Sequence, residues 1–352
     1  MSWSMSAVSY RMAGTGSWKD LFIDESSQQL YSEIYPLGVP MSWFDDRLRG
    51  LINSWQQSNI VSLDDQNIVP IGPIITNDDI GILNSWFRDI SDSMCDAILY
   101  RISEYKSLAL RMAGDKSSIK QDVENIMTIQ ICAQTLDSGV FSLLRKGLIG
   151  SYPSRGFAGN FFFWGYAFDT GPRRIFGFTT YRSLGGLMLH VIRSHDLNRK
   201  RIKDLLNEHN AMEILEEVFN IIEASGNAAT WEYLYSKISG EVVESLIDVN
   251  ILKPDDPPRF AIPNFCTSNI YMKHIIQLNR EVSEKIFNNI VNRINELKSL
   301  VSMCSFSQCF WPDILCMLFH LAYSYAADKL VEMGKLPDFP KSAGGEWGIW
   351  MS

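Results

Sequence analysis

The sequence predicts a mainly α-helical protein with two helical lobes, a basic, aromatic-rich hinge that contains a short β-hairpin, and an arm at each end. First, apolar residues recur at three- and four-residue steps in long runs on both sides of the middle of the chain. Second, this period stops over residues 149–204, where Gly, Pro and aromatic residues crowd together. Third, both ends carry Trp and Met with little periodicity.

Residues 1–40 are predicted to be an N-terminal arm, extended and anchored by its apolar side chains rather than folded alone. The helical N-lobe is expected over residues 41–148. Asp78 and Asp79 open its first helical pattern, since acidic residues favour the first turn of a helix. A second apolar pattern covers residues 120–148.

The hinge, residues 149–204, has a dense run of aromatic side chains from Phe161 to Phe168. Residues 169–172 (Asp-Thr-Gly-Pro) predict a turn between two short extended runs, and therefore a β-hairpin. Helical structure is expected to resume directly after it, over residues 184–192.

The helical C-lobe is expected over residues 205–335. Within it, residues 211–265 contain three helical stretches, then two short extended runs around a charged, Pro-rich turn. This order of elements resembles the winged-helix family. Amphipathic helices are expected over 282–301 and 312–334, and residues 336–352 are the predicted C-terminal arm.

The composition narrows the class of protein. The chain has 352 residues, 46% of them hydrophobic, which suits a globular protein of about two domains. A net charge of −8 argues against a general binder of polyanions. The six cysteines form no C-x-x-C pair and indicate reduced thiols. With no run typical of a signal peptide or a membrane span, the expected location is intracellular, without membrane contact.

Positive charge is concentrated in residues 142–206, which we call the basic segment. Eleven basic residues and three acidic ones give it a net charge of +8, so the rest of the chain carries −16. Such asymmetry is typical of a surface that binds phosphates. The basic residues are Arg145, Lys146, Arg155, Arg173, Arg174, Arg182, Arg193, Arg199, Lys200, Arg201 and Lys203.

Aromatic residues interleave with these cations, among them Trp164 and Tyr166. Proteins that bind single strands combine a positive groove with rings on which bases stack. We therefore take the eleven cations together with Trp164 and Tyr166 as the candidate nucleic-acid-binding set. In the alternative interpretation the rings form core, and the arginines are solvated or paired with acidic neighbours.

The winged-helix-like segment has the opposite charge. Residues 211–265 hold ten acidic and three basic residues, a net charge of −7. The presumed third helix carries Glu241, Glu244 and Asp248 and no basic residue. Because readers of duplex DNA need a basic recognition helix, this segment is expected to pack against, or bind, protein.

Cys304, Cys309, Cys316 and His320 lie within 17 residues. Zinc ligands usually come in closer pairs, so two interpretations stay open: a metal site, or buried thiols that act as small hydrophobes. The sequence holds no nucleotide-binding loop and no motif for a catalytic nucleophile or metalloprotease. We expect no enzymatic activity and no cofactor, with an unrecognised active site as a further alternative.

Residues 157–159 (Phe-Ala-Gly) and 164–167 (Trp-Gly-Tyr-Ala) resemble a stretch in the nucleoproteins of non-segmented negative-strand RNA viruses. There, aromatic residues alternate with Gly and Ala beside the RNA cleft. The resemblance implies two helical lobes, a basic cleft and terminal arms that exchange between neighbours. This chain departs from that pattern in the mid-chain position of the stretch and in the winged-helix-like segment.

The resemblance implies a non-enzymatic, self-assembling nucleoprotein that packages single-stranded RNA in a basic groove between the lobes. Arg and Lys would neutralise phosphates, and homo-oligomers would form through residues 1–40 and 336–352 in the host cytoplasm, nucleus or virion. The alternative is a winged-helix protein-interaction or regulatory module without nucleic acid, whose protein partner binds residues 211–265.

Overall fold

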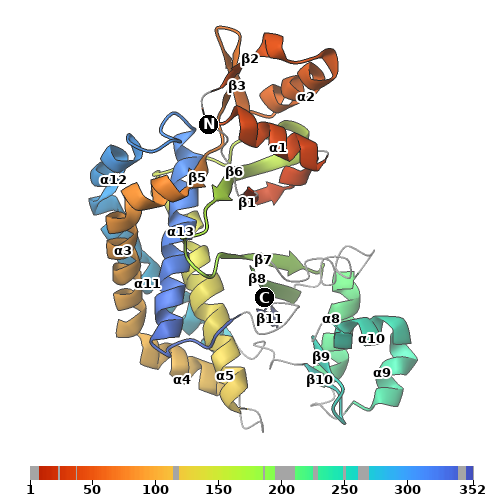
Figure 1. Cartoon of the computed structure of the whole chain (residues 1–352). Helices are drawn as coiled ribbons and strands as arrows, with labels where there is room; N and C mark the ends of the chain where they lie inside the picture. The colour runs from red at the N-terminus through yellow and green to blue at the C-terminus, as the bar shows by residue number, and fades with distance from the viewer. Residues whose placement is uncertain are drawn as a thin grey trace. The chain divides into compact units, whose positions relative to one another are not determined.

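A computed structural model describes residues 8–22, 24–36, 38–113, 119–184, 187–194, 211–224, 229–248, 251–260, 269–339 and 346–351. Helices dominate these residues, and the strands form four small sheets among them (Figure 1). The expected mainly α-helical class is therefore confirmed.

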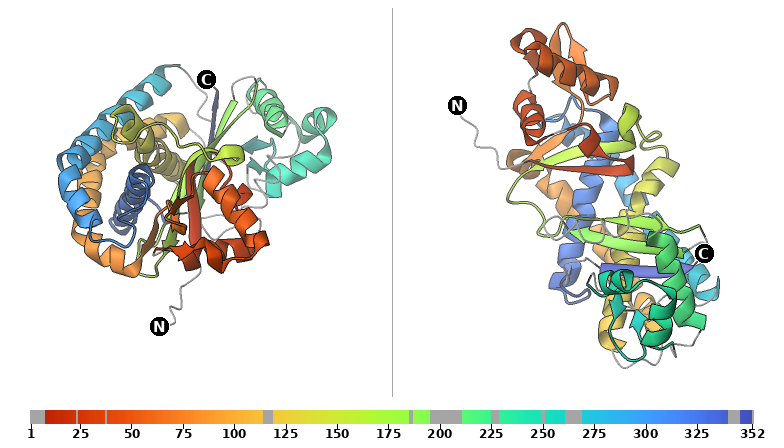
Figure 2. Two further views of the ribbon diagram at one scale, coloured as in Figure 1. Left: turned by 90° about the horizontal axis from the view of Figure 1, so that it is seen from above. Right: turned by 90° about the vertical axis from the view of Figure 1, so that its right-hand side faces the viewer.

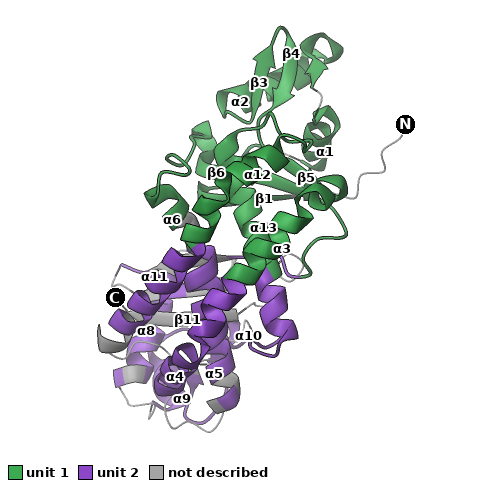
Figure 3. Ribbon diagram, turned by 90° about the vertical axis from the view of Figure 1, so that its left-hand side faces the viewer, with its two compact units in different colours: residues 1–93, 139–173, 287–325 green, residues 94–138, 174–286, 326–352 purple. Residues whose placement is uncertain are grey.

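The chain forms two compact units that are discontinuous in sequence (Figure 3). Unit 1 consists of Met1–Ser93, Gly139–Arg173 and Phe287–Tyr325, and unit 2 of Met94–Ser138, Arg174–Ile286 and Ala326–Ser352. These units do not follow the expected lobes at 41–148 and 205–335. The expected hinge is itself divided between them after Arg173.

Unit 1 contains a three-stranded sheet with the aromatic strand at its centre. Strand β6 (Gly159–Ala167) pairs antiparallel with β1 (Ser9–Gly16) and parallel with β5 (Ile74–Thr76), and β1 and β6 lie side by side in the views of Figure 2. Gly16 and Gly159 face each other in the register, both with positive φ. A Cβ on Gly159 would lie 2.3 Å from the carbonyl oxygen of Thr15, so only glycine fits this close approach.

The expected extended N-terminal arm is wrong as a description of the described part of residues 1–40. The segment folds onto its own chain through β1 and continues into helix α1 (Glu25–Ile34). Asp24 caps α1, because its side chain accepts a hydrogen bond of 2.8 Å from the backbone N–H of Ser27. The residues expected to form an arm instead form strand β1, which completes the sheet with β6, and helix α1.

The other elements of unit 1 are short, apart from the long helices that it shares with unit 2. Helix α3 begins at Asn77, and the buried Asp79 accepts hydrogen bonds from the backbone N–H groups of Thr76 (2.9 Å) and Ser305 (2.8 Å). This confirms the predicted helix start. The remaining elements are η1 (Trp18–Asp20), β2 (Val39–Pro40), η2 (Met41–Trp43), α2 (Asp46–Gln57), β3 (Val61–Asp64), β4 (Asn67–Pro70), α6 (Gly139–Arg145), η4 (Gly156–Ala158) and α12 (Ile294–Val301).

Three long helices contribute residues to both units: α3 (Asn77–Tyr100), α11 (Asn269–Asn292) and α13 (Trp311–Glu332). In the described part of the chain, α13 is the one helix long and apolar enough to cross a membrane by length and composition. Its most apolar window is 83% buried inside the protein, which is typical of a core helix.

Unit 2 places α4 (Ile102–Ala113) against α5 (Ile119–Thr128), which continues into a π-helix, η3 (Ile129–Asp137). The single helix expected over 120–148 is thus interrupted. The buried Thr135 of η3 hydrogen-bonds the hydroxyl of Tyr105 (2.8 Å) and donates to the side-chain oxygen of Asn279 (2.9 Å). These bonds join α4, η3 and α11.

A three-stranded sheet lies in unit 2, in the order β11 (Glu346–Met351), β8 (Leu187–Ser194), β7 (Phe176–Arg182), all antiparallel. The expected helix over 184–192 is wrong, because most of that run is β8. The expected hairpin is also misplaced: it joins β7 to β8, whereas β6 and β7 belong to different sheets. The C-terminal arm is wrong for residues 346–351, which pair with β8 of their own chain.

Residues 211–265, which we call the acidic module, contain the elements in the expected order. Helices α8 (Ala211–Ala224), α9 (Trp231–Lys237) and α10 (Gly240–Asp248) precede an antiparallel pair, β9 (Leu252–Lys253) and β10 (Arg259–Phe260). Thr230 caps α9, and Trp231 Nε1 donates a 2.7 Å hydrogen bond to the carbonyl of Asp255 at the turn before β10.

Candidate functional site

The aromatic side chains of β6 form the core of unit 1. Trp164 and Tyr166 are 1% and 4% exposed. The Trp164 ring lies 4.6 Å, centroid to centroid, from the ring of His320 on α13, and Phe163 stacks on Tyr10 of β1. In this structure the rings contact other side chains of the protein and are not presented to bases. Their burial agrees with the alternative interpretation, in which these rings form part of the protein core.

Arg155 is also interior. Its side chain is 1% exposed, and its guanidinium lies 2.6 Å from the fully buried carboxylate of Asp313. It further donates to the carbonyls of Phe161 (3.1 Å) and Asn59. Burial raises the pKa of Asp313 to about 6, although the Arg155 charge opposes the shift. Arg155 therefore belongs to a buried ion pair and not to an RNA surface.

Arg174 is held by acidic neighbours within unit 2. Its guanidinium contacts the carboxylates of Asp328 (2.7 Å) and Asp338, and donates to the carbonyl of Phe339 (3.2 Å). Burial disfavours its charge, but hydrogen bonds to the two carboxylates outweigh burial, so the pKa of Arg174 is raised. The positive charge of Arg174 is therefore already paired with carboxylates of the same chain.

Three of the candidate cations are exposed in the described part of the chain: Arg145, Lys146 and Arg173. Arg145 donates a hydrogen bond of 3.1 Å to Ser142. Arg182 and Arg193 lie on strands β7 and β8, but their side chains lie outside the described residues. Four more, Arg199, Lys200, Arg201 and Lys203, also lie outside them.

The structure does not bring the four candidate metal ligands into one cluster, although Cys316 Sγ lies 3.7 Å from His320 Nδ1. Within the described residues, no group of three or more His, Cys, Asp or Glu side chains could hold a metal ion. Cys304 donates to the carbonyl of Leu300, and His320 Nδ1 lies 2.7 Å from the carbonyl oxygen of Cys316. Burial raises the pKa of both Cys304 and Cys309 to about 12, so these thiols stay protonated at neutral pH.

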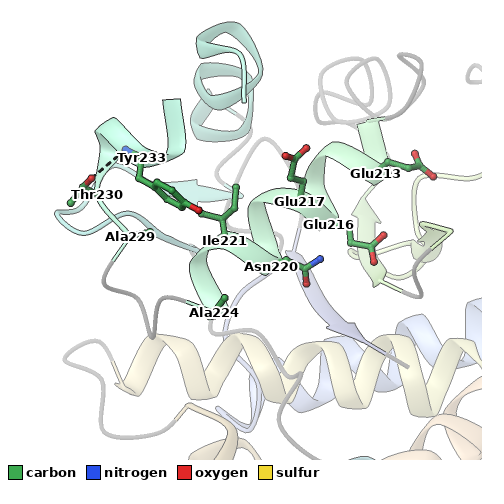
Figure 4. A pocket seen from close by; sticks show the side chains of 9 residues that line it. All are labelled: Glu213, Glu216, Glu217, Asn220, Ile221, Ala224, Ala229, Thr230 and Tyr233. Carbon is green, nitrogen blue, oxygen red and sulfur yellow. Dashed lines mark hydrogen bonds between the residues drawn. The ribbon is translucent and has the colours of Figure 1, made fainter. Parts of the chain in front are cut away.

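An open groove lies between α8 and α9 of the acidic module, with a volume of about 760 Å³ (Figure 4). Helix α8 buries one face through Leu215, Val218 and Ile222, so its opposite face lines the groove. The side chains that line it are Glu213, Glu216, Glu217, Asn220, Ile221 and Ala224 of α8, with Ala229, Thr230 and Tyr233.

The groove combines acidic and apolar chemistry. Three glutamates line the N-terminal half of α8, while Ile221, Ala224 and the Tyr233 ring line the other end (Figure 4). Tyr233 is 48% exposed, and Lys237 Nζ lies 5.8 Å from its ring centroid. This ring therefore already contacts one cation.

Sequence reasoning predicted the acidity of this module but missed the groove. The signal was present, because the groove-lining residues of α8 recur at three- and four-residue steps opposite its apolar stripe. The contribution of α9 could not be seen in this way, since it depends on how the two helices pack.

Comparisons with protein families, with curated proteins and with solved structures find no match to this chain. The nucleoprotein and winged-helix resemblances therefore remain predictions from the sequence.

Proposed function

We propose that this protein is a non-catalytic interaction protein whose acidic module recognises another protein rather than nucleic acid. The observation that carries this proposal is the charge of the module's exposed surfaces. Glu241, Glu244 and Asp248 are exposed on α10, and three glutamates line the groove between α8 and α9. Phosphates would be repelled at both places, whereas a protein with basic side chains would be attracted.

A photo-crosslinking residue in place of Tyr233 tests this proposal. Tyr233 lines the groove and is exposed, so a bound protein lies within reach of a crosslinker there. The matched control carries the same crosslinker in place of Tyr100, an exposed tyrosine on α3. We expect protein adducts at position 233 and not at position 100. Equal adducts at both positions, or adducts to nucleic acid at 233, would contradict the proposal.

The second candidate function is the packaging of single-stranded RNA, which the charge of the basic segment favours. Arg145, Lys146 and Arg173 are exposed, and the sequence places four further cations between positions 199 and 203. Because Trp164 and Tyr166 are buried, RNA bases cannot stack on these rings in this structure. RNA binding would then depend on contacts between cations and backbone phosphates alone. Assembly through exchanged arms would require β1 or β11 to leave its own sheet.

This second function is tested by the affinity for a short single-stranded RNA at low salt. Lys146→Glu with Arg173→Glu changes two exposed cations and leaves the buried ion pairs intact. Arg174 is unsuitable because its replacement breaks contacts with Asp328 and Asp338. RNA packaging predicts that affinity falls about tenfold or more and that its salt dependence becomes shallower. No RNA binding by the unchanged protein would remove this function.

A further inference from the structure

We propose that the groove between α8 and α9 binds the basic stretch 199–203 of a second copy of this chain. The proposal deepens the proposed function and rests on it, since it names the protein partner of the acidic module. The stretch reads Arg-Lys-Arg-Ile-Lys, the densest run of positive charge in the sequence.

Charge complementarity within one sequence supports a second copy as the partner. The acidic module carries −7 and the basic segment +8. Two copies of such a chain attract each other wherever the module of one meets the basic segment of the other, and like-charged encounters are disfavoured.

The chemistry of the groove fits such a stretch. Lys and Arg side chains place an apolar stem on apolar surface while the charged head stays in a polar environment. Here Ile221 and Ala224 offer the apolar floor, and Glu213 and Glu217 offer carboxylates. The Tyr233 ring, which already contacts Lys237, can accept a further guanidinium on its surface.

The contact would join two different surfaces, so in a pair one copy would keep its groove free and the other its basic stretch, each for a further neighbour. Heterologous interfaces of this kind produce rings or open chains. The attraction is electrostatic and acts between charges that are accessible to solvent. Because salt screens such charges, the assembly should weaken strongly as the salt concentration rises.

The first experiment measures the self-association of the full chain by analytical ultracentrifugation at low salt. The groove variant carries Glu213→Gln, Glu216→Gln and Glu217→Gln. The control variant carries Glu232→Gln, Glu241→Gln and Glu244→Gln, the same change of charge on exposed residues of the same module outside the groove. We expect the groove variant to weaken association about tenfold or more and the control by about twofold or less. An equal loss in both variants would show an effect of net charge alone and overturn the proposal.

The second experiment mixes two variants that each lack one side of the contact. One is the groove variant, and the other carries Arg199→Gln, Lys200→Gln and Arg201→Gln. At a protein concentration where each variant alone is monomeric, their mixture should form 1:1 dimers and nothing larger, since one intact groove meets one intact stretch. A matched chain with Arg145→Gln, Lys146→Gln and Arg173→Gln, the same change of charge, should assemble as the unchanged protein does.

The remaining outcomes separate the two proposals. If the unchanged chain is monomeric at every concentration, the second copy is not the partner and the inference is wrong. If such a monomer still forms protein adducts at position 233, the proposed function survives that result. If nucleic acid is crosslinked at position 233 and no protein is, both proposals fail.

Discussion

At the scale of single residues, Arg155 ties three segments of unit 1 together. Its guanidinium binds Asp313 of α13, the carbonyl of Phe161 on β6 and the carbonyl of Asn59 after α2. A buried cation with this many partners is costly to remove, because each partner is left unsatisfied in the interior. The sequence could not reveal this role, since Asp313 lies 158 residues away.

Arg155→Met should lower the free energy of unfolding by about 3–5 kcal/mol at neutral pH, as is typical when one partner of a buried ion pair is lost. Urea unfolding measures the change. Arg280→Met is the matched control, because Arg280 pairs with Glu284 on the surface, and it should cost about 0.5 kcal/mol or less. Similar losses in both variants would contradict the interior role of Arg155.

The stability should also depend on pH through Asp313. Its pKa is raised by burial from 3.8 to about 6, so between these values the folded state holds a proton that the unfolded chain has released. The stabilising contribution is complete below about pH 4 and is lost as the pH rises through 6. Without Arg155 the loss should extend above pH 6, because the pKa of Asp313 rises further. A pH-independent difference between Arg155→Met and the unchanged protein would contradict this.

At the scale of elements, local signals predicted the acidic module well and the sheets poorly. In the sequence, Ser and Gly residues, which commonly interrupt helices, stand between the helical runs of the module, and these signals lie within the segment itself. Strand β8 was mistaken for a helix because a short apolar run fits both periods. Its strand state depends on pairing with β7 and with β11, some 160 residues later in the chain.

Gly159→Ala should destabilise unit 1 by about 3 kcal/mol, because positive φ and the approach of Thr15 both exclude a side chain. Hydrogen exchange should accelerate along β1, its partner strand. Gly177→Ala on β7 is the control, since a Cβ there meets nothing within 4 Å. Unchanged exchange in β1 after the first substitution would show that the β1–β6 pairing does not depend on this glycine.

Thr135→Val should cost about 1–3 kcal/mol, because it leaves the buried Tyr105 hydroxyl and Asn279 amide short of a partner. Hydrogen exchange should increase in η3, where the Thr135 hydroxyl oxygen also lies 2.9 Å from the carbonyl oxygen of Gln130. Thr170→Val, at an exposed threonine that donates to Asn77, should change stability by about 0.5 kcal/mol or less. Equal costs at both sites would rule out a special role for the Thr135 network.

At the scale of the whole molecule, the described cations of the basic segment lie in different environments. The segment supplies a buried cation (Arg155), a cation paired within unit 2 (Arg174) and exposed cations such as Lys146 and Arg173. Net charge along the sequence predicted attraction for a polyanion, but burial and pairing reduce the set that could contact one. The opposite net charges of the two segments follow from the sequence itself and do not depend on the fold.

The central claim is that this protein associates with protein and not with nucleic acid. Light scattering with absorbance at 260 and 280 nm, on protein purified without nuclease, tests it most directly. We expect particles of protein alone, larger than one chain at low salt, that dissociate to monomers at about 0.5 M salt, where exposed charges are strongly screened. Particles that contain nucleic acid and lose it as the salt rises would contradict the claim.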